Sequence, residues 1–372
     1  MKKICYVVSS EMTIKAFLKE QLRDLGQEYD LTVVVHTENK TLLDELSIKG
    51  SLITLELKRE ISILADIKAL FELVSVFKKN KYDLVHSITP KAGLLCSWAA
   101  KIAGIRDRIH TFTGQVWANK KGIKRIVLKI FDKVIAYNCS HLLADSFSQR
   151  DFIVEEGVVR KEKINVLANG SISGVDLDRF VRNEEERASI RRKHNISDET
   201  CVILFLGRLK KDKGVLELLE AFNKMDNYDC VLMLVGPDED GIEKDVSTYN
   251  NNGNIIRIGY TDKPEDYFSV ADIFCLPSHR EGFGTVIIEA AAAKLPSVAS
   301  NIYGVRDAVV DAETGLLHEK GNAEDIKDKL AILIENKALR EEYGNNAYKR
   351  AHKLYNKAVV NKALYRYYKE IL

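Results

Sequence analysis

The sequence predicts an α/β fold of two Rossmann-like, doubly wound domains that face each other across a cleft. Short apolar runs alternate with helix-periodic segments along the whole chain, which is the pattern of parallel strands covered by helices. A turn-rich stretch, NGSISGVDLDRF, and a charged segment at 183–195 interrupt this pattern near the middle. The chain has 372 residues, which is long for one core and typical of two domains.

The first domain is expected at residues 1–180. Its predicted strands are KICYVV, LTVVVH, SLITLEL, LVHSI, RIHTF, HLLAD and KINVLA. Helices between them are expected to include 12–26, 64–79 and 92–103. Such a sheet places the strand ends, and the loops that follow them, at one edge.

The second domain is expected at residues 181–355, where the alternation restarts. Its predicted strands are VILFLG, CVLMLVG, IIRIGY, IFCLPS, PSVAS and TGLLHE. The last segment, 356–372, is predicted to be a helix with an aromatic cluster near its end. A ligand is expected in the cleft, outside the carboxyl ends of the strands.

Composition indicates a cytoplasmic protein. The cysteines form no CxxC pair, and several lie in apolar runs, which favours reduced core thiols over disulfides or zinc. They are Cys5, Cys96, Cys139, Cys201, Cys230 and Cys275. The apolar run at the N-terminus is too short for a signal peptide, and no stretch of 18 apolar residues exists to span a membrane. No nucleic acid partner is expected.

The motif GRLKKDKG directly follows the predicted strand VILFL. Gly207 permits a tight exit from that strand, and Arg208 and Lys213 then lie beside the start of the next helix. Two cations and free backbone N–H groups at this edge suit a diphosphate. The alternative is an ordinary charged loop.

A second motif, EGFGTVIIEA, follows the strand IFCLP, and its helix is expected to run from near Gly284 to Lys294. Glu281 in the loop is expected to accept hydrogen bonds from hexose hydroxyls, and Glu289 in the helix from ribose hydroxyls. Eight residues of helical rise correspond to about 12 Å, roughly the reach from a ribose to the sugar beyond its second phosphate. The alternative is a capped helix with a carboxylate in its first turns.

Between these two carboxylates lies a loop suited to phosphates. Gly282 and Gly284 let the backbone approach closely, and free N–H groups are expected at the helix start. The backbone groups expected to face the donor belong to Phe283, Gly284, Thr285 and Val286. Tyr260, after a third strand, is expected near a base edge.

Two acidic i, i+2 patterns could hold a divalent ion: Asp238-Glu239-Asp240 and Asp176-Leu177-Asp178. Both lie in turn-rich stretches, where acidic residues are common for other reasons. Neither a metal nor another cofactor is expected, because Arg208 and Lys213 supply positive charge.

These motifs resemble family 4 of the retaining glycosyltransferases, which have the GT-B fold. The resemblance rests on EGFGTVIIEA, GRLKKDKG, LPSHREGFG and ETGLL, and is densest from about 200 to 320. It implies that Arg208 and Lys213 bind the donor diphosphate, Glu281 the donor sugar and Glu289 the ribose. It also implies a metal-free reaction and a last helix that crosses back onto the first domain.

The acceptor is expected at the first domain. SITPKAGLL resembles a segment of relatives that extend saccharides on polyprenyl diphosphate, as does the linker ANGSISGVDLDRF. Lys91, at the start of a helix, is the candidate contact for an acceptor diphosphate. A solvated lysine is the alternative.

A basic amphipathic helix is expected from Ile123 onward. Its apolar stripe comprises Ile123, Ile126, Val127, Ile130, Phe131 and Val134, with Trp117 ahead of it. The cations around it are Lys120, Lys121, Lys124, Arg125, Lys129 and Lys133. Such a helix can bind the inner face of the cytoplasmic membrane. In the alternative, the stripe packs on the first sheet.

One position departs from the family pattern. Many members have a histidine before the glycine of a TFHG-like segment, but here IHTFTGQVW places Thr113 there. The nearest imidazole, His110, is three residues away and is expected on the opposite face of the strand. Both residues are candidates near the reacting carbon. A front-face transfer, in which the leaving phosphate takes the acceptor proton, reduces the need for either.

The sequence therefore predicts retaining transfer of a hexose or N-acetylhexosamine from a UDP-sugar to a lipid-linked saccharide, in bacterial surface polysaccharide synthesis. Two alternatives remain: a UDP-sugar epimerase of the same fold, and a non-catalytic protein that binds nucleotide-sugars. A dinucleotide dehydrogenase is disfavoured, because no GxGxxG follows the first strand of either domain.

Overall fold

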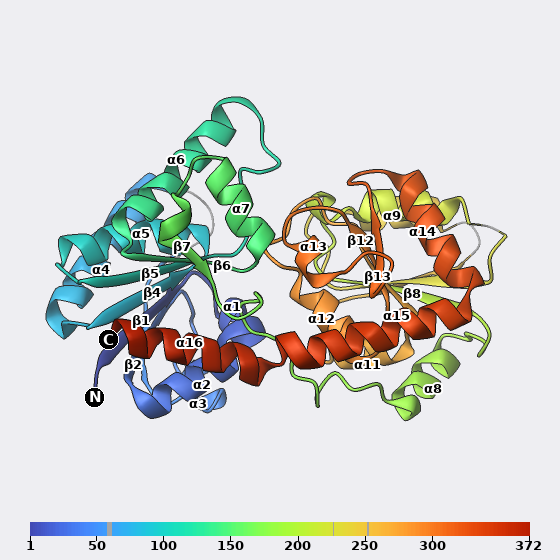
Figure 1. Ribbon diagram of the computed structural model, residues 1–372, viewed down its shortest axis with the longest axis horizontal. Coiled ribbons are helices and arrows are strands. Elements are labelled where there is room, and N and C mark those ends of the chain that lie inside the picture. Colours follow the sequence, from blue (N-terminus) through green and yellow to red (C-terminus); the bar gives the residue numbers. More distant parts are fainter. Residues whose placement is uncertain (58–61, 226, 251–252) are drawn as a thin grey trace. The chain divides into compact units, whose positions relative to one another are not determined.

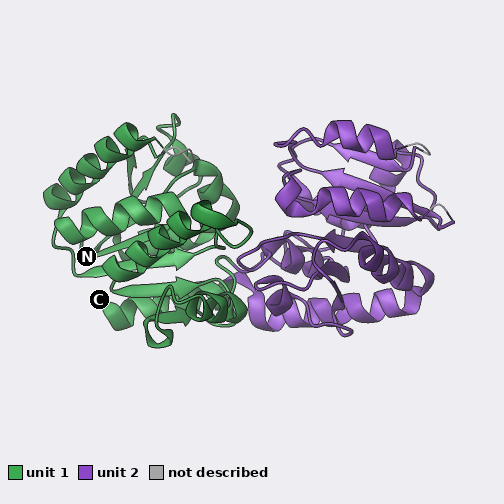
Figure 2. Cartoon of the chain, turned by 90° about the horizontal axis from the view of Figure 1, so that it is seen from above, with its two compact units in different colours: residues 1–173, 358–372 green, residues 174–357 purple. Residues whose placement is uncertain are grey.

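A computed structural model describes residues 1–57, 62–225, 227–250 and 253–372. The chain divides into two compact units, coloured separately in Figure 2. Unit 1 comprises residues 1–173 and 358–372, and unit 2 comprises residues 174–357. Each unit is built on one parallel sheet, so the predicted α/β class is confirmed.

Unit 1 contains a seven-stranded sheet in the order β3-β2-β1-β4-β5-β6-β7 (Figure 1). The strands are β1 Lys3–Val8, β2 Asp30–Val35, β3 Ser51–Thr54, β4 Leu84–Ile88, β5 Asp107–Phe112, β6 His141–Ala144 and β7 Ile164–Val166. Every strand predicted for this half is present, because each apolar run is long enough for a buried strand and too short for a helix.

The helices of unit 1 cover both faces of its sheet. They are α1 Glu11–Thr13, η1 Ile14–Leu18, α2 Lys19–Glu28, α3 Leu42–Glu45, α4 Ile63–Asn80, α5 Pro90–Ile102, α6 Gly122–Asn138, α7 Phe147–Glu155, η2 Lys161–Lys163 and α16 Lys357–Ile371. The sheet has an apolar core on each face, and alternate side chains of β1 point into one core or the other. Tyr6 packs in the cluster that includes residues of η1, α2 and α16, and Cys5 packs with residues of α4 and α5.

Unit 2 contains a six-stranded sheet in the order β10-β9-β8-β11-β12-β13. The strands are β8 Cys201–Leu206, β9 Cys230–Val235, β10 Ile255–Ile258, β11 Ile273–Leu276, β12 Ser297–Ser300 and β13 Gly315–His318. The helices are α8 Glu184–Lys193, η3 Lys211–Lys213, α9 Val215–Asn223, α10 Glu243–Tyr249, α11 Pro264–Val270, α12 Thr285–Ala292, α13 Val305–Ala308, α14 Ala323–Glu335, α15 Lys337–Arg350 and η4 Ala351–Tyr355. All six predicted strands are present.

The unit boundaries differ slightly from the predicted 180/181 and 355/356. Val175 forms a parallel bridge with Asn356, and its N–H donates to the carbonyl of Tyr355 at 2.7 Å. Phe180 is buried in the core of unit 2. The part of the turn-rich linker from Gly174 onward therefore belongs to unit 2, which a composition-based boundary does not detect.

Helix α16 packs within unit 1, although unit 2 precedes it in the sequence. The Tyr368 hydroxyl lies 3.0 Å from that of Tyr6 and 2.5 Å from Nδ1 of His86. At the rim, Tyr365 donates to Glu28, and Asn361 to Asp24. Unit 1 is thus assembled from two separate stretches of the chain.

Candidate functional site

The site in unit 2 lies where the strand order reverses. Strands β8 and β11 are neighbours in the sheet and run parallel, so the loops that follow them leave from the same edge. The loop after β8 carries GRLKKDKG, and the loop after β11 carries PSHREGFG. A ligand of a doubly wound sheet binds at such a switch point.

Lys213 and Glu281 meet at this edge. The ammonium of Lys213 lies 2.6 Å from Oε1 of Glu281, and the hydroxyl of Ser278 donates to the same oxygen at 2.7 Å. Both side chains of the ion pair are largely buried, at 18% and 15% exposure. The structure brings these two predicted residues together, and it adds Ser278, which the sequence motif did not single out.

Gly214 makes that meeting possible. Its φ is +69°, and a Cβ built on it would lie 2.0 Å from the carbonyl oxygen of Pro277. Next to it, the N–H of His279 donates to the carbonyl of Asp212 at 2.9 Å. The two loops are therefore in backbone contact, and a side chain at position 214 would force them apart.

Arg208 is held by a carboxylate from a third loop. Its guanidinium lies 3.0 Å from Glu239, which follows β9. Glu239 also pairs with Lys210 at 3.3 Å. Sequence reasoning considered Glu239 only as a metal ligand, and no spacing rule could have linked it to Arg208.

The two acidic patterns with possible metal-ligand spacing form other contacts in the structure. The carboxylate of Asp238 accepts hydrogen bonds from the backbone N–H groups of Asp240, Gly241, Ile242 and Glu243. Asp176 pairs with Lys357 at 2.6 Å. Within the described residues, His, Cys, Asp and Glu side chains form no cluster suited to a metal ion.

Helix α12 begins one residue after Gly284, which has a φ of +83°. Its first hydrogen bond runs from the N–H of Ile287 to the carbonyl of Gly284, so the preceding N–H groups have no intrahelical acceptor. The Phe283 ring is buried against Tyr355, with ring centroids 5.0 Å apart. Phe283 can therefore offer a ligand only its backbone.

Glu289 lies in α12, and burial raises its pKa to about 7, while nearby Arg179 opposes that rise. Arg179 itself pairs with Glu265 at 2.9 Å. Glu281 lies outside the helix, so helical rise does not set the whole spacing between the two carboxylates, and the separation of about 12 Å stays a prediction. Only the part of the spacing that starts at Thr285 is helical.

Of the remaining donor candidates, Thr285 and Val286 are the first residues of α12, and the others lie in loops. Tyr260 follows β10 and is 72% exposed. Gly207 follows β8, and a Cβ on Gly236 would lie 2.0 Å from its carbonyl oxygen. Gly282 approaches Gly304 in the same way, with 2.6 Å between its carbonyl oxygen and a Cβ built on Gly304.

In unit 1, the corresponding switch point lies between β1 and β4. The hydroxyls of Ser9 and Thr89, which follow these strands, lie 3.0 Å apart. Thr89 has a φ of +77°, an unfavourable conformation for a β-branched residue. Lys91, at the start of α5, forms an ion pair with Asp66 of α4 at 2.6 Å.

His110 belongs to the core between β5 and α5. It is 1% exposed, its Nδ1 lies 3.0 Å from the hydroxyl of Ser87, and its ring fills the space beside Gly93. Burial lowers its pKa to about 3. These contacts argue against the catalytic role that the sequence left open, whereas Thr113 is half-buried directly after β5.

His86 is an imidazole that sequence reasoning missed. Its Nε2 lies 2.8 Å from the hydroxyl of Thr111, its Nδ1 contacts Tyr368, and burial lowers its pKa to about 3. These contacts lock α16 to the sheet. Because its partners come from β5 and from the last helix, no local motif could have revealed it.

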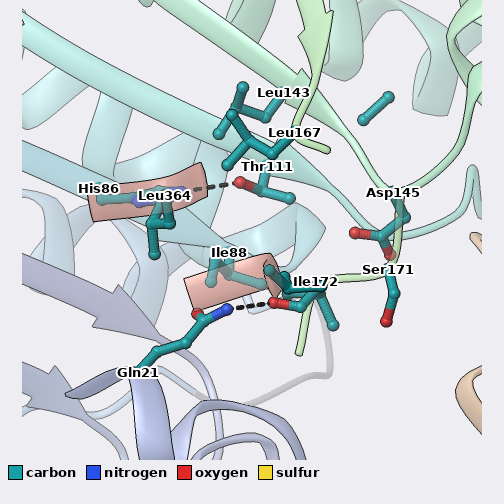
Figure 3. A pocket seen from close by; sticks show the side chains of 12 residues that line it. Gln21, His86, Ile88, Thr111, Leu143, Asp145, Leu167, Ser171, Ile172 and Leu364 are labelled. Carbon is teal, nitrogen blue, oxygen red and sulfur yellow. Dashed lines mark hydrogen bonds between the residues drawn. The ribbon is translucent and has the colours of Figure 1, made fainter. Parts of the chain in front are cut away.

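A cavity of about 30 Å³, large enough for about one water molecule, lies beside His86 (Figure 3). Asp145, at the end of β6, lines it and is 6% exposed. Its Oδ1 has no hydrogen-bond partner, and burial raises its pKa to about 8. Burial therefore favours the protonated, neutral form of Asp145.

The apolar stripe of α6 faces solvent. Its exposed members are Ile123, Ile126, Val127 and Ile130, at 80%, 58%, 41% and 49% exposure. The alternative in which this stripe packs on the sheet is therefore wrong for these four residues, whereas Phe131 and Val134 are half-buried. The buried face instead carries Asp132, Ile135 and Ala136.

The comparisons with known proteins agree with this geometry. The pattern described as Glycosyltransferase Family 4 matches residues 16–179, and that described as Glycosyl transferases group 1 matches residues 186–350. The capsular polysaccharide biosynthesis glycosyltransferase CapM of Staphylococcus aureus is 33% identical over 309 residues, 82% of this chain and 81% of CapM. The chain belongs to the family 4 glycosyltransferases.

Other similar proteins extend this assignment. The Escherichia coli UDP-Gal:alpha-D-GlcNAc-diphosphoundecaprenol alpha-1,3-galactosyltransferase is 27% identical over 324 residues, 84% of this glycosyltransferase and 82% of that enzyme. The structure of Anabaena Alr3699/HepE in complex with UDP and glucose superposes with a TM-score of 0.81 at 18% identity, covering 99% of this chain and 100% of the other. The fold is therefore GT-B.

Proposed function

We propose that this glycosyltransferase moves a hexose or N-acetylhexosamine, with retention, from a UDP-sugar to a polyprenyl-diphosphate-linked saccharide. The process would be bacterial surface polysaccharide synthesis, of capsule or O-antigen. The observation that carries the proposal is that the Lys213–Glu281 pair, Arg208 and the start of α12, whose first N–H groups have no intrahelical acceptor, belong to loops at one edge of the unit 2 sheet. This edge offers cations and N–H donors for a diphosphate and a carboxylate for sugar hydroxyls.

The chemistry follows from these groups. The bond between the sugar C1 and the UDP oxygen breaks, the acceptor oxygen bonds to C1 on the same face, and the acceptor proton passes to the departing phosphate. Arg208, Lys213 and the α12 N–H groups stabilise the charge that develops on the diphosphate. One such preorganised donor contributes about 3–4 kcal/mol of transition-state stabilisation. The proposal needs neither a side-chain base nor a divalent ion.

The printed names of similar proteins support the choice of substrates. The E. coli relative is named for UDP-Gal and for an acceptor on diphosphoundecaprenol. A Campylobacter jejuni relative, 25% identical, is named for a diphospho-undecaprenol acceptor as well. CapM is named for capsular polysaccharide biosynthesis. A lipid-linked acceptor would bring this enzyme to the inner face of the cytoplasmic membrane as a peripheral protein.

No helix among the described residues is long and apolar enough to cross a bilayer. Helix α6, with its outward apolar stripe and its lysines, supports peripheral binding instead. The identity of the donor and that of the acceptor can be tested without testing the membrane location.

The test is a screen of UDP- and GDP-sugars against synthetic polyprenyl diphosphate saccharides, with EDTA present. We expect UDP release that requires an acceptor, together with a product that retains the anomeric configuration. Conversion of a UDP-sugar without an acceptor would indicate an epimerase, and UDP binding without turnover would indicate a non-catalytic protein. Loss of activity with EDTA would contradict the metal-free reaction.

A further inference from the structure

Three neighbouring helices of unit 1 present large apolar side chains to solvent. Helix α5 lies between α4 and α6 and contacts both (Figure 1). The exposed residues are Ile63, Leu64, Ile67 and Phe71 of α4, Trp98 and Ile102 of α5, and Ile123, Ile126, Val127, Ile130 and Tyr137 of α6. This surface is much larger than the α6 stripe that the sequence pattern predicted.

Helix α4 contributes an apolar stripe of its own. Ile63, Ile67 and Phe71 are spaced by four residues and therefore share one face, and their exposed fractions are 73%, 48% and 68%. The face turned to the sheet is also apolar and is buried: Ala69, Leu73 and Phe77. A helix that is apolar on both its inner and its outer side needs a partner for the outer one.

The charges around this surface indicate an anionic partner. Helix α6 and the two residues before it carry six Lys and Arg side chains and one acidic residue, Asp132. Asp132 is buried, so its carboxyl group does not lie on this surface. Lys120, Lys121, Lys124 and Lys133 are exposed beside the apolar stripe. Exposed lysines along α6, at one side of an apolar surface, complement the headgroups and acyl chains of an anionic bilayer.

The aromatic residues of the surface fit the same partner. Trp98 is 47% exposed and Tyr137 is 77% exposed, and the ammonium of Lys101 lies 4.1 Å from the Tyr137 ring centre. Aromatic rings with one polar end prefer the level of the headgroups, and lysine side chains reach from there to phosphates. A protein partner would bury these lysines, and removing their ammonium groups from water would cost free energy.

We propose that α4, α5 and α6 form one surface that binds an anionic phospholipid bilayer, with Phe71, Trp98 and Ile126 entering the headgroup–acyl boundary. This inference rests on the proposed membrane-linked acceptor and deepens it, because it assigns insertion to α4 and α5 as well as to α6. The lysines of α6 contact the headgroups.

Trp98 provides a direct optical test. The chain has two tryptophans, and the other, Trp117, is fully buried, so a change of emission on vesicle binding reports Trp98. We expect vesicles of phosphatidylcholine with about one third phosphatidylglycerol to shift the emission to the blue, and brominated acyl chains to quench it. Trp98→Phe should remove both signals and leave flotation with the vesicles. An unchanged emission of Trp98 in the presence of floated protein would overturn the insertion of α5.

Charge substitutions test α4 and α6 separately. Phe71→Glu and Ile126→Glu should each weaken vesicle binding by about tenfold or more, because a buried apolar side chain is replaced by a charge that the anionic surface repels. Ile332→Glu on α14, which is 43% exposed and lies in unit 2, is the matched control and should bind like the wild type. If Phe71→Glu floats like the wild type, α4 has no part in binding, and the proposal is wrong.

Two further measurements distinguish failure of the bilayer assignment from failure of the proposed function. Sedimentation without lipid distinguishes a self-association surface: concentration-dependent dimers that both substitutions abolish would overturn the bilayer assignment. UDP binding by calorimetry, without vesicles, should be equal in the wild type and all three charge variants. Protein that binds UDP and transfers sugar to a short-chain acceptor, but does not float, would refute this inference alone. Protein that floats but binds no UDP would refute only the proposed function.

Discussion

Both cations assigned to the diphosphate already pair with carboxylates, Arg208 with Glu239 and Lys213 with Glu281. These pairs are only partly exposed, so solvent screens them less than it screens surface pairs. The carboxylates hold the cations at the edge of the sheet before a donor binds. A diphosphate carries more charge than one carboxylate and can replace it at each cation.

We predict that Lys213→Ala lowers kcat by about 10²–10³, because it removes a preorganised charge from the leaving group and leaves Glu281 without its cation. Lys211→Ala is the matched control, since Lys211 belongs to the same short helix, η3, but has an exposed side chain. The measurement is steady-state UDP release, with circular dichroism to verify folding. Comparable rates for the two variants would remove the assigned role of Lys213.

For single residues, the sequence predicted which side chains converge only where the order of the strands in the sheet determines their positions. Arg208, Lys213 and Glu281 follow strands whose neighbourhood is fixed by the doubly wound topology, so their convergence was predictable; their catalytic roles stay predictions. Glu239 was not predictable, because its approach to Arg208 depends on the path of a loop. His86 was missed because its partners lie 25 and 282 residues away.

At the scale of elements, Gly214 sets the contact between the loops after β8 and β11. We predict that Gly214→Ala lowers the free energy of unfolding of unit 2 by more than about 1 kcal/mol and weakens UDP binding about tenfold or more. The added methyl group would meet the carbonyl of Pro277 and move Lys213 away from Glu281. Calorimetric unfolding and UDP titration measure the two effects.

Gly241→Ala is the control that separates the effect of backbone strain from the effect of the contact with Pro277. Gly241 has a similar φ, +75°, but a Cβ there would meet no atom within 4 Å. It should show the stability loss of a strained backbone without the loss of UDP binding. Equal UDP affinity in the Gly214 and Gly241 variants would mean that the close contact with Pro277 does not position the site.

Helix α16 gives a second prediction at this scale. Tyr368→Phe should lower the stability of unit 1 by about 1–3 kcal/mol, because Nδ1 of His86 and the hydroxyl of Tyr6 lose a buried partner. Tyr365→Phe removes a hydrogen bond at the solvent-exposed rim and should cost clearly less. Urea unfolding followed by tryptophan emission reports unit 1, which contains both tryptophans. Equal losses in the two variants would contradict a buried network.

The elements themselves were largely predictable from the sequence, and their surroundings were not. Every strand was visible as an apolar run, because parallel strands buried on both faces carry continuous apolar residues. The orientation of α6 was left open, because an apolar stripe at helical spacing looks the same whether it meets a sheet or solvent. The predicted boundary between the units was wrong by several residues for a related reason. A polar linker can still form backbone hydrogen bonds with the unit that follows it, as Val175 does next to Asn356.

At the scale of the whole molecule, buried titratable groups make the stability of unit 1 depend on pH. Burial raises the pKa of Asp132 to about 7 and that of Asp145 to about 8. The folded state therefore holds these protons more tightly, and stability falls as pH rises from about 4 towards 8. His86 and His110, whose pKa values burial lowers to about 3, act oppositely: stability falls as pH drops from about 6.5 towards 3.

We predict that unit 1 is most stable between about pH 4 and 6.5, where the two effects oppose each other, and that its stability declines from there to about pH 8. Asp145→Asn should make the decline above pH 6.5 shallower. The measurement is the urea midpoint of tryptophan emission at a series of pH values. An unchanged slope in Asp145→Asn would show that Asp145 is ionised in the folded protein.

The divided composition of unit 1 has a consequence for synthesis on the ribosome. Its sheet is translated first, yet the helix that covers Tyr6 and His86 is encoded after all of unit 2. Unit 2 is continuous and can close as soon as it emerges, since domains generally fold as units. The first unit to be made is thus the last to be finished, and until then part of its apolar core is open to chaperones and proteases.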